Sequence, residues 1–195
     1  MNARKGELMS SEAKVVVLVG SLRKDSLNRN MANALIALNI PSLKFEFAEL
    51  GHLPLYNQDL DGENPPAAWV SFRQQIASAD AFLFVTPEYN RSVPAALKNA
   101  LDVASRPYGK GAWDGKPGAV ISVSPGAAGG FGANHHLRQS LVFLNVPMMQ
   151  QPEAYIGGAA NFFDAGGKLT SESTRDLLTK FGHAFAAWIE ANRKR

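Results

Sequence analysis

Cysteine is missing from the sequence: none of the 195 residues is a cysteine. This absence excludes disulfide bridges, cysteine-ligated zinc and iron–sulfur sites, and catalysis by a thiol. Long hydrophobic runs are missing too, since no apolar stretch reaches the roughly 18 residues of a membrane-spanning helix. The first 13 residues hold charged side chains and no apolar segment typical of a signal peptide. We therefore expect a disordered tail over residues 1–13 and a cytoplasmic protein without membrane insertion.

The sequence has almost no excess of charge of one sign outside the C-terminus. The net charge is +3, from 20 Lys and Arg against 17 Asp and Glu, and the last three residues (Arg193, Lys194 and Arg195) supply this whole excess. A nucleic-acid-binding domain concentrates basic residues on a folded face. We therefore expect no nucleic-acid partner.

What the sequence does have is the composition of a packed domain, with 46% apolar and 19% charged residues. Short apolar runs rich in β-branched or aromatic residues alternate with stretches whose apolar residues recur at helical spacing. The expected strands are residues 15–19, 44–48, 81–85 and 119–123, with an irregular fifth formed by 148–149 and 155–156 around Pro152. The expected helices are residues 27–38, 65–78, 94–104, 134–145 and 174–192. Residues 106–117, with three Gly and two Pro, are expected to form a loop.

Five strand-then-helix units indicate an α/β fold, with a parallel sheet covered by helices on both faces, in one domain over residues 14–195. In such sheets ligands bind beyond the carboxyl ends of the strands, where the strand order reverses. The loops after Val19, Val85 and Val123 are therefore the candidates for a binding site.

The loop after the first strand, residues 20–28, combines the hydroxyls of Ser21 and Ser26 with the Asn28 amide and the Arg23 guanidinium. Together with the free N–H groups of a helix start, these groups suit a dianionic phosphate. The loop matches neither G-x-x-x-x-G-K-[ST] nor G-x-G-x-x-G. Two interpretations of the loop alone remain open: a phosphate site, or a turn at Gly20 followed by a helix cap at Ser26.

The loop after the third strand, residues 86–94, is stiffened by Pro87 and Pro94 and can present fixed donors and the Tyr89 ring to a planar ligand. A rigid connection capped by Ser92 would explain part of it, but gives no reason for Glu88, Tyr89 and Asn90 in sequence. After the fourth strand comes Ser124, followed by a glycine-rich turn over residues 126–132.

The first and third loops together resemble the NADPH-dependent FMN reductase family, and most closely the bacterial quinone reductases also described as chromate reductases. The residues that carry the resemblance are Gly20-Ser21-Leu22-Arg23 with Ser26 and Asn28, then Thr86-Pro87-Glu88-Tyr89-Asn90 with Ser92-Val93-Pro94 and Leu97-Lys98-Asn99-Ala100. The likeness runs from about Val15 to Ile156. It implies a flavodoxin-like three-layer sandwich with strand order 2-1-3-4-5 and FMN at the junction of the first and third strands.

The resemblance also implies roles for individual residues. Ser21, Arg23, Ser26 and Asn28 would hold the FMN phosphate, and Leu27 is a further cofactor-binding residue of this loop. Pro87, Glu88, Tyr89 and Asn90 would line the isoalloxazine ring, and Ser124 would contact its pyrimidine side, with Gly126 allowing close approach. Hydride would pass from NADPH or NADH through the flavin to a quinone in a ping-pong reaction, with chromate, azo or nitro compounds as further acceptors. Neither a catalytic side chain nor a metal is expected. The chain would work as a homodimer or homotetramer.

Alternatives to this enzyme are a flavodoxin-type electron carrier and a flavin-based redox sensor, both without turnover. Three residues have no assigned role. His135 and His136 are adjacent, so on a helix they point in different directions and make a poor metal-binding pair; one would line an interface or the pocket mouth. Trp113, in the loop over 106–117, is a candidate to cover the ligand site of this or a neighbouring subunit.

Overall fold

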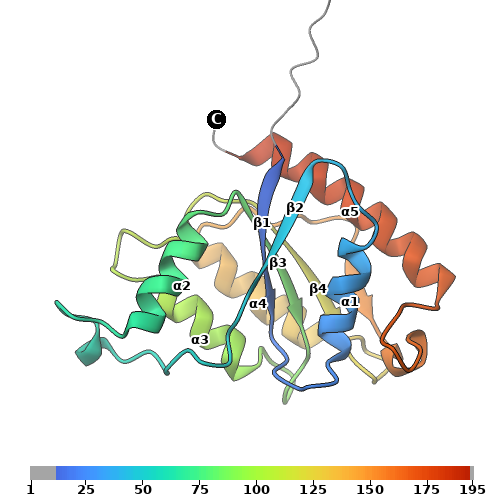
Figure 1. The fold of residues 1–195 in the computed structure, drawn as a ribbon, viewed down its shortest axis with the longest axis horizontal. Coiled ribbons are helices and arrows are strands. Elements are labelled where there is room, and N and C mark those ends of the chain that lie inside the picture. Colours follow the sequence, from blue (N-terminus) through green and yellow to red (C-terminus); the bar gives the residue numbers. More distant parts are fainter. Residues whose placement is uncertain (1–11, 194–195) are drawn as a thin grey trace, which may run out of the picture.

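The computed structural model describes residues 12–193. The predicted tail lies outside the described residues except for its last two, and Ala13 already belongs to the first strand. Five parallel strands form one sheet in the order β2-β1-β3-β4-β5 (Figure 1). They are β1 (Ala13–Val19), β2 (Leu43–Ala48), β3 (Ala81–Thr86), β4 (Gly118–Val123) and β5 (Ala154–Ile156). The predicted fold class and strand order are confirmed.

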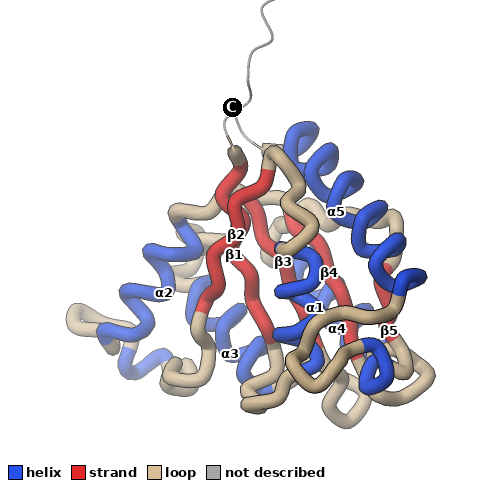
Figure 2. Tube along the Cα trace, turned by 45° about the vertical axis from the view of Figure 1, so that its right-hand side comes forward, coloured by secondary structure: helices blue, strands red, loops and turns tan. Residues whose placement is uncertain are grey.

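Helices cover both faces of this sheet, as Figures 1 and 2 show. One face packs against α1 (Leu27–Ile36) and α5 (Glu172–Asn192). The other face packs against α2 (Ala67–Ala77), α3 (Ala95–Ala104) and α4 (Phe131–Phe143). Two short 3-10 turns, Gln58–Leu60 and Ala159–Phe162, interrupt the connecting loops.

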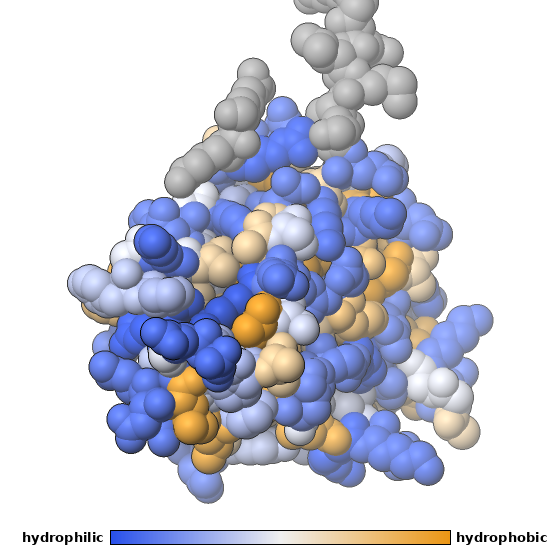
Figure 3. Space-filling view, turned by 60° about the vertical axis from the view of Figure 1, so that its left-hand side comes forward, coloured by the Kyte–Doolittle hydropathy of each residue, from blue (hydrophilic) through white to orange (hydrophobic). Residues whose placement is uncertain are grey.

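The central strands are buried on both faces, which explains their continuous apolar sequences. Every residue of β3 and β4 is buried, and so are six of the seven residues of β1. Odd-numbered residues of β1 face α1 and α5, whereas Val16 and Leu18 face the other layer. In α2 the residues Trp69 and Phe72 are buried in the core. The molecular surface on the side of α2 is mostly hydrophilic, with small separate apolar patches (Figure 3).

Most elements differ from their predicted extents by two residues or fewer at each end, and two elements differ by more. Helix α4 begins at Phe131 instead of Asn134, because Gly130 takes a left-handed conformation and starts the helix inside the glycine-rich segment. Strand β5 contains only residues 154–156, and Met148 forms just an isolated bridge with Gly118. Pro152, which has no N–H to donate, lies between these two pairings.

Within the described part of the chain, no helix has both the length and the apolar character needed to cross a membrane.

Candidate functional site at the carboxyl ends of β1, β3 and β4

The loops after β1 and β3 contact each other where the strand order reverses. The backbone N–H of Gly20 donates to the carbonyl of Val85 at 2.9 Å, which continues the β1–β3 pairing by one residue. A Cβ atom on Gly20 would lie 2.8 Å from Cγ of Pro94 and 3.1 Å from Cδ of Pro87. Gly20 is therefore required for close packing of the two loops, and the predicted ligand edge of the sheet is formed by both.

Ser26 begins α1 as its N-cap. Its Oγ accepts a hydrogen bond from the backbone N–H of Arg29 at 3.2 Å, and the residue is buried. The capping interpretation of this loop is thus correct for Ser26. Capping occupies one of the free N–H groups at the helix start, and the others stay available to an anion.

Asn28, in the first turn of α1, is buried with one polar atom unsatisfied. Its Nδ2 lies 3.5 Å from the carbonyl of Val123 at the end of β4, whereas its Oδ1 has no hydrogen-bond partner among the described residues. A buried polar atom without a partner is rare in folded proteins because its desolvation is not compensated. The Asn28 amide therefore fits a ligand that supplies a hydrogen bond at this position.

Arg23 is exposed in the same loop and forms no ion pair within residues 12–193. Ser21 is half-buried, and Leu27 is the half-buried first residue of α1. The first loop therefore brings an uncompensated guanidinium, a hydroxyl and a helix N-terminus to one edge of the sheet. This donor set suits a phosphate.

Residues 89–92 form a tight turn after β3. Tyr89 and Ser92 exchange backbone hydrogen bonds of 3.1 and 3.0 Å. The two central residues, Asn90 and Arg91, have φ angles of 51° and 65°, which is the pattern of a type I′ turn. The two backbone hydrogen bonds close the turn, and Tyr89 is 47% exposed on it.

Glu88 ties this turn to the start of α4. Its Oε2 accepts a hydrogen bond from the backbone N–H of Ala133 at 3.1 Å, and its Oε1 lies 3.4 Å from a guanidinium nitrogen of Arg91. A Cβ atom on Gly132 would lie 2.9 Å from both Oε2 of Glu88 and the carbonyl oxygen of Arg91. Glu88 thus orders the loop, and Gly132 allows α4 to begin against it.

The loop after β4 is held on its other side by the end of β5. The backbone N–H of Ser124 donates to Ile156 at 2.9 Å, and Oγ of Ser124 accepts from the N–H of Gly126 at 3.1 Å. Around Gly126 a Cβ atom would meet only Oγ of Ser124, at 3.5 Å. One side of Gly126 is therefore open to a ligand.

His135 and His136 point to different partners from α4. Nδ1 of His136 lies 3.0 Å from Oγ of Ser92, and Nε2 of His135 lies 2.9 Å from the hydroxyl of Tyr155. The Tyr155 hydroxyl donates to Glu153 at 2.7 Å, so its oxygen accepts from the His135 ring. Burial, with a smaller contribution from Glu153, raises the pKa of Tyr155 to about 12, and the phenol stays protonated.

Trp113 does not cover a ligand site, and that prediction is wrong. The side chain is 1% exposed and packs against Phe72, Phe82 and Phe84. Its indole N–H donates to the carbonyl of Leu101 at 3.1 Å. The loop over 106–117 turns inward here because a large apolar ring gains more from burial under α3 than from exposure.

A buried polar chain that the sequence did not reveal holds α4 against the sheet. Nδ2 of Asn134 donates to Oγ of Ser122 in β4 at 3.2 Å, and its Oδ1 accepts from Nε of Arg138 at 2.9 Å. Arg138 also donates to the carbonyl of Met149 at 2.9 Å. The signal in the sequence was Ser122, a hydroxyl within an otherwise apolar run.

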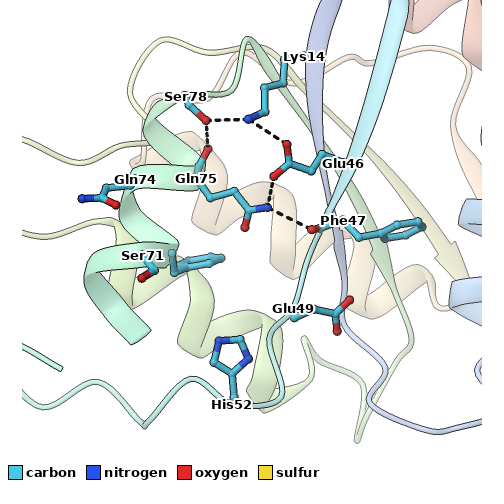
Figure 4. Close-up of a pocket in the computed structure, with 10 residues that line it drawn as sticks. Lys14, Glu46, Phe47, Glu49, His52, Ser71, Gln74, Gln75 and Ser78 are labelled. Carbon is cyan, nitrogen blue, oxygen red and sulfur yellow. Dashed lines mark hydrogen bonds and ion pairs between the residues drawn. The ribbon is translucent and has the colours of Figure 1, made fainter. Parts of the chain in front are cut away.

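A groove of about 510 Å³ lies elsewhere, between the edge strand β2 and α2 (Figure 4). Gln75 donates to the carbonyl of Phe47 at 3.1 Å and to the Glu46 carboxylate at 2.6 Å, and Lys14 pairs with Glu46 at 2.9 Å. The hydrogen bond from Lys14 lowers the pKa of Glu46. These side chains shield the free edge of β2, and the groove takes no residue from the three loops.

The structure thus gathers the predicted residues of the first, third and fourth loops at one edge of the sheet. Contacts join Gly20 to Pro87, and Asn28 to the end of β4 next to Ser124. Their individual roles toward a cofactor stay predictions. Among the described residues, Oδ1 of Asn28 and the Arg23 guanidinium have no partner, and one side of Gly126 is open. These groups together fit FMN, which presents ribityl hydroxyls, a phosphate and a flat ring.

An open parallel sheet in this order, with its candidate site at the β1–β3 junction, defines a protein of the flavodoxin-like class. A family model described as NADPH-dependent FMN reductase matches residues 13–161. A quinone reductase of Pseudomonas putida is 60% identical over 185 residues, which cover 95% of this chain and 99% of that protein. A 2-hydroxy-1,4-benzoquinone reductase of a Burkholderia species is 49% identical and covers 92% of this chain and 98% of its own.

A solved structure of a flavoenzyme is also similar to this chain, in both fold and sequence. The flavoenzyme FerB of Paracoccus denitrificans, an NAD(P)H:acceptor oxidoreductase, superposes with a TM-score of 0.87 at 43% identity, covering 93% of this chain and 100% of that one. The chain belongs to the NADPH-dependent FMN reductase family.

Proposed function

We propose that this chain is an FMN-dependent oxidoreductase that passes two electrons from NAD(P)H to quinones. The observation that carries the proposal is the first loop and the helix start that follows it. The buried side-chain oxygen of Asn28 has no hydrogen-bond partner, and Arg23 no ion pair, within residues 12–193. The relatives named as quinone reductases, which match almost the whole chain, support the choice of acceptor.

The geometry of the loops supports a set of proposed contacts with FMN. Ser21, Arg23 and the free N–H groups of α1, with Ser26 and Leu27 shaping the helix start, would bind the FMN phosphate. Asn28 would hydrogen-bond a ribityl hydroxyl through its Oδ1. Further along, the turn formed by Pro87, Glu88, Tyr89 and Asn90 would line one side of the isoalloxazine ring, and Ser124 and Gly126 would lie at its pyrimidine side.

Bound FMN supplies the redox chemistry, accepting a hydride from NAD(P)H and delivering two electrons to the acceptor. The chain's own residues bind and orient. Glu88 keeps the Tyr89 turn fixed on α4. Tyr89, which is exposed on this turn, would shield one side of the ring from water. Both carboxylate oxygens of Glu88 are already engaged, so it is assigned a positioning role and solvent supplies protons to the reduced quinone.

We also propose that the protein works as a homodimer or homotetramer in the cytoplasm, where NAD(P)H is regenerated. A groove of about 610 Å³ between α3 and α4 opens beside Ser92, and Val142 and Phe143 on α4 are 73% and 79% exposed. A second copy would cover these apolar side chains. Chromate, azo and nitro compounds would be reduced at the same open ring face as quinones.

The experiment is steady-state oxidation of NADPH and of NADH by FMN-loaded protein, with and without a benzoquinone. The proposed function predicts rapid oxidation that depends on the quinone, with parallel lines in double-reciprocal plots. An electron carrier or sensor would bind FMN and show almost no turnover. That result would refute the enzymatic proposal while leaving the flavin site intact.

A further inference from the structure

Arg91 occupies a backbone position that an arginine rarely takes. It is the second central residue of the turn over residues 89–92, with a φ angle of 65°. Turns of this type strongly prefer glycine there, because a Cβ atom makes the left-handed conformation costly. Asn90 at the first position follows the usual preference, and Arg91 does not. A strained residue retained at a ligand site points to a role for its side chain.

The guanidinium of Arg91 is available to a ligand. The side chain is 81% exposed, and the one ion-pair partner it has within residues 12–193 is Glu88, at 3.4 Å. The Glu88 carboxylate is 13% exposed and uses its other oxygen to accept from Ala133. An exposed contact of this length contributes little to stability, so it does not explain why arginine stands at this position.

The contacts of the turn fix the position of the Arg91 backbone. A Cβ atom on Gly132, at the start of α4, would lie 2.9 Å from the carbonyl oxygen of Arg91. The turn is closed by two backbone hydrogen bonds. The Arg91 backbone is therefore held at the candidate site, in the same turn as the exposed Tyr89. The phosphate of FMN is assigned to a different loop, at the start of α1. The Arg91 guanidinium is therefore available to a different anionic group.

We propose that Arg91 selects NADPH over NADH by pairing its guanidinium with the 2′-phosphate of the dinucleotide. The inference rests on the proposed function, in which a nicotinamide must reach the open ring face beside the same turn. The two donors differ only in this phosphate. A planar guanidinium forms paired, charge-assisted hydrogen bonds with phosphate, and Lys cannot reproduce this geometry.

The test uses FMN-loaded wild type and the variants Arg91→Gly and Arg91→Lys. Lys180→Ala on α5, an exposed cation far along the chain from the loops, serves as a matched loss of one charge. Calorimetry with 2′,5′-ADP and 5′-AMP measures recognition of the 2′-phosphate without hydride transfer. Steady-state assays give KM and kcat for NADPH and for NADH.

Wild type is expected to bind 2′,5′-ADP about tenfold more tightly than 5′-AMP, a difference of about 1.4 kcal/mol. In Arg91→Gly this preference is lost and KM for NADPH rises about tenfold, while kcat and KM for NADH are unchanged. Arg91→Lys is intermediate, and Lys180→Ala matches wild type. Because glycine accepts the left-handed backbone, Arg91→Gly should melt no lower than wild type.

The proposal is overturned if wild type does not discriminate between the two nucleotides, or if Arg91→Gly keeps the preference. An equal rise of KM for both donors would also overturn it, since that outcome indicates a general role in shaping the site. Failure of the proposed function is distinct: wild type would then oxidise neither donor, whereas discrimination between 2′,5′-ADP and 5′-AMP could still be measured.

Discussion

The carboxylate of Glu88 and the backbone N–H of Ala133 join two of the three loops at the candidate site, through a hydrogen bond of 3.1 Å. Glu88 follows β3, and Ala133 lies in the first turn of α4, which follows β4. A carboxylate at a helix N-terminus satisfies a free donor and interacts favourably with the helix dipole. The turn that carries Tyr89 is thereby fixed relative to the sheet.

Glu88→Ala should loosen this turn. Losing a hydrogen bond that involves a charged group is expected to lower the free energy of unfolding by about 1.5–3 kcal/mol and to weaken FMN binding about tenfold. Urea unfolding and fluorescence titration with FMN measure the two effects. The exposed Glu63→Ala serves as the control. Unchanged FMN affinity in Glu88→Ala would show that the Tyr89 turn does not shape the flavin site.

Gly20→Ala tests the contact between the first and third loops. A Cβ atom 2.8 Å from Pro94 and 3.1 Å from Pro87 forces a stiff, proline-bounded loop to move. We expect a loss of about 1–3 kcal/mol in stability, as for other overpacked sites, together with weaker FMN binding. Gly62→Ala is the matched control, because nothing lies within 4 Å of a Cβ atom there. Equal stability of the two variants would contradict this packing.

Arg23→Ala removes the unpaired guanidinium from the first loop. Because Arg23 is exposed and has no ion pair within residues 12–193, the fold should be unaffected. FMN binding should weaken by about 1.5–3 kcal/mol, the contribution of a hydrogen bond to a charged group. The dissociation constant of FMN, compared with that of Lys180→Ala, gives the answer. If both variants bind FMN as wild type does, the phosphate assignment of Arg23 is wrong.

Asp61→Asn tests an ion pair that anchors the loop before α2. Both carboxylate oxygens of Asp61 bind Arg73, at 2.7 and 2.8 Å, and this hydrogen bonding lowers the pKa of Asp61 below its ordinary 3.8. The pair therefore stabilises the fold above the ordinary pKa, and the contribution is lost as the pH falls through the lowered value.

At pH 7 we expect Asp61→Asn to be less stable by about 1–3 kcal/mol, and the difference from wild type should shrink below about pH 4. Urea unfolding across this pH range measures it. A difference that stays constant from pH 7 to pH 3 would mean that the stabilisation does not come from the ionised carboxylate.

Most of the fold was predictable because short local patterns of apolar residues indicate its strands and helices. The runs at 15–19, 81–85 and 119–123 are apolar throughout, as strands buried on both faces require, and they lie in the centre of the sheet. The two larger differences arose where tertiary contacts decide. The start of α4 depends on the left-handed backbone of Gly130 and on Gly132 lying against Glu88, and β5 depends on which residues around Pro152 can pair with β4.

The candidate site was predictable as three loops, since the carboxyl ends of neighbouring parallel strands meet at one edge. Individual contacts were not. The burial of Asn28 without a partner for Oδ1 and the left-handed backbone of Arg91 appear only when the loops are packed together. Trp113 misled the prediction because a tryptophan in a glycine-rich loop shows nothing of the core pocket between Phe72 and Phe82 that receives it.

The central claim is that the helix start after β1 binds the phosphate of FMN. Calorimetric titration of flavin-free protein with FMN and with riboflavin, which lacks the phosphate, tests it most directly. We predict that FMN binds at least about 100-fold more tightly, because several charge-assisted hydrogen bonds are made only by the phosphate. Equal affinity for the two flavins, or no binding of either, would contradict the account.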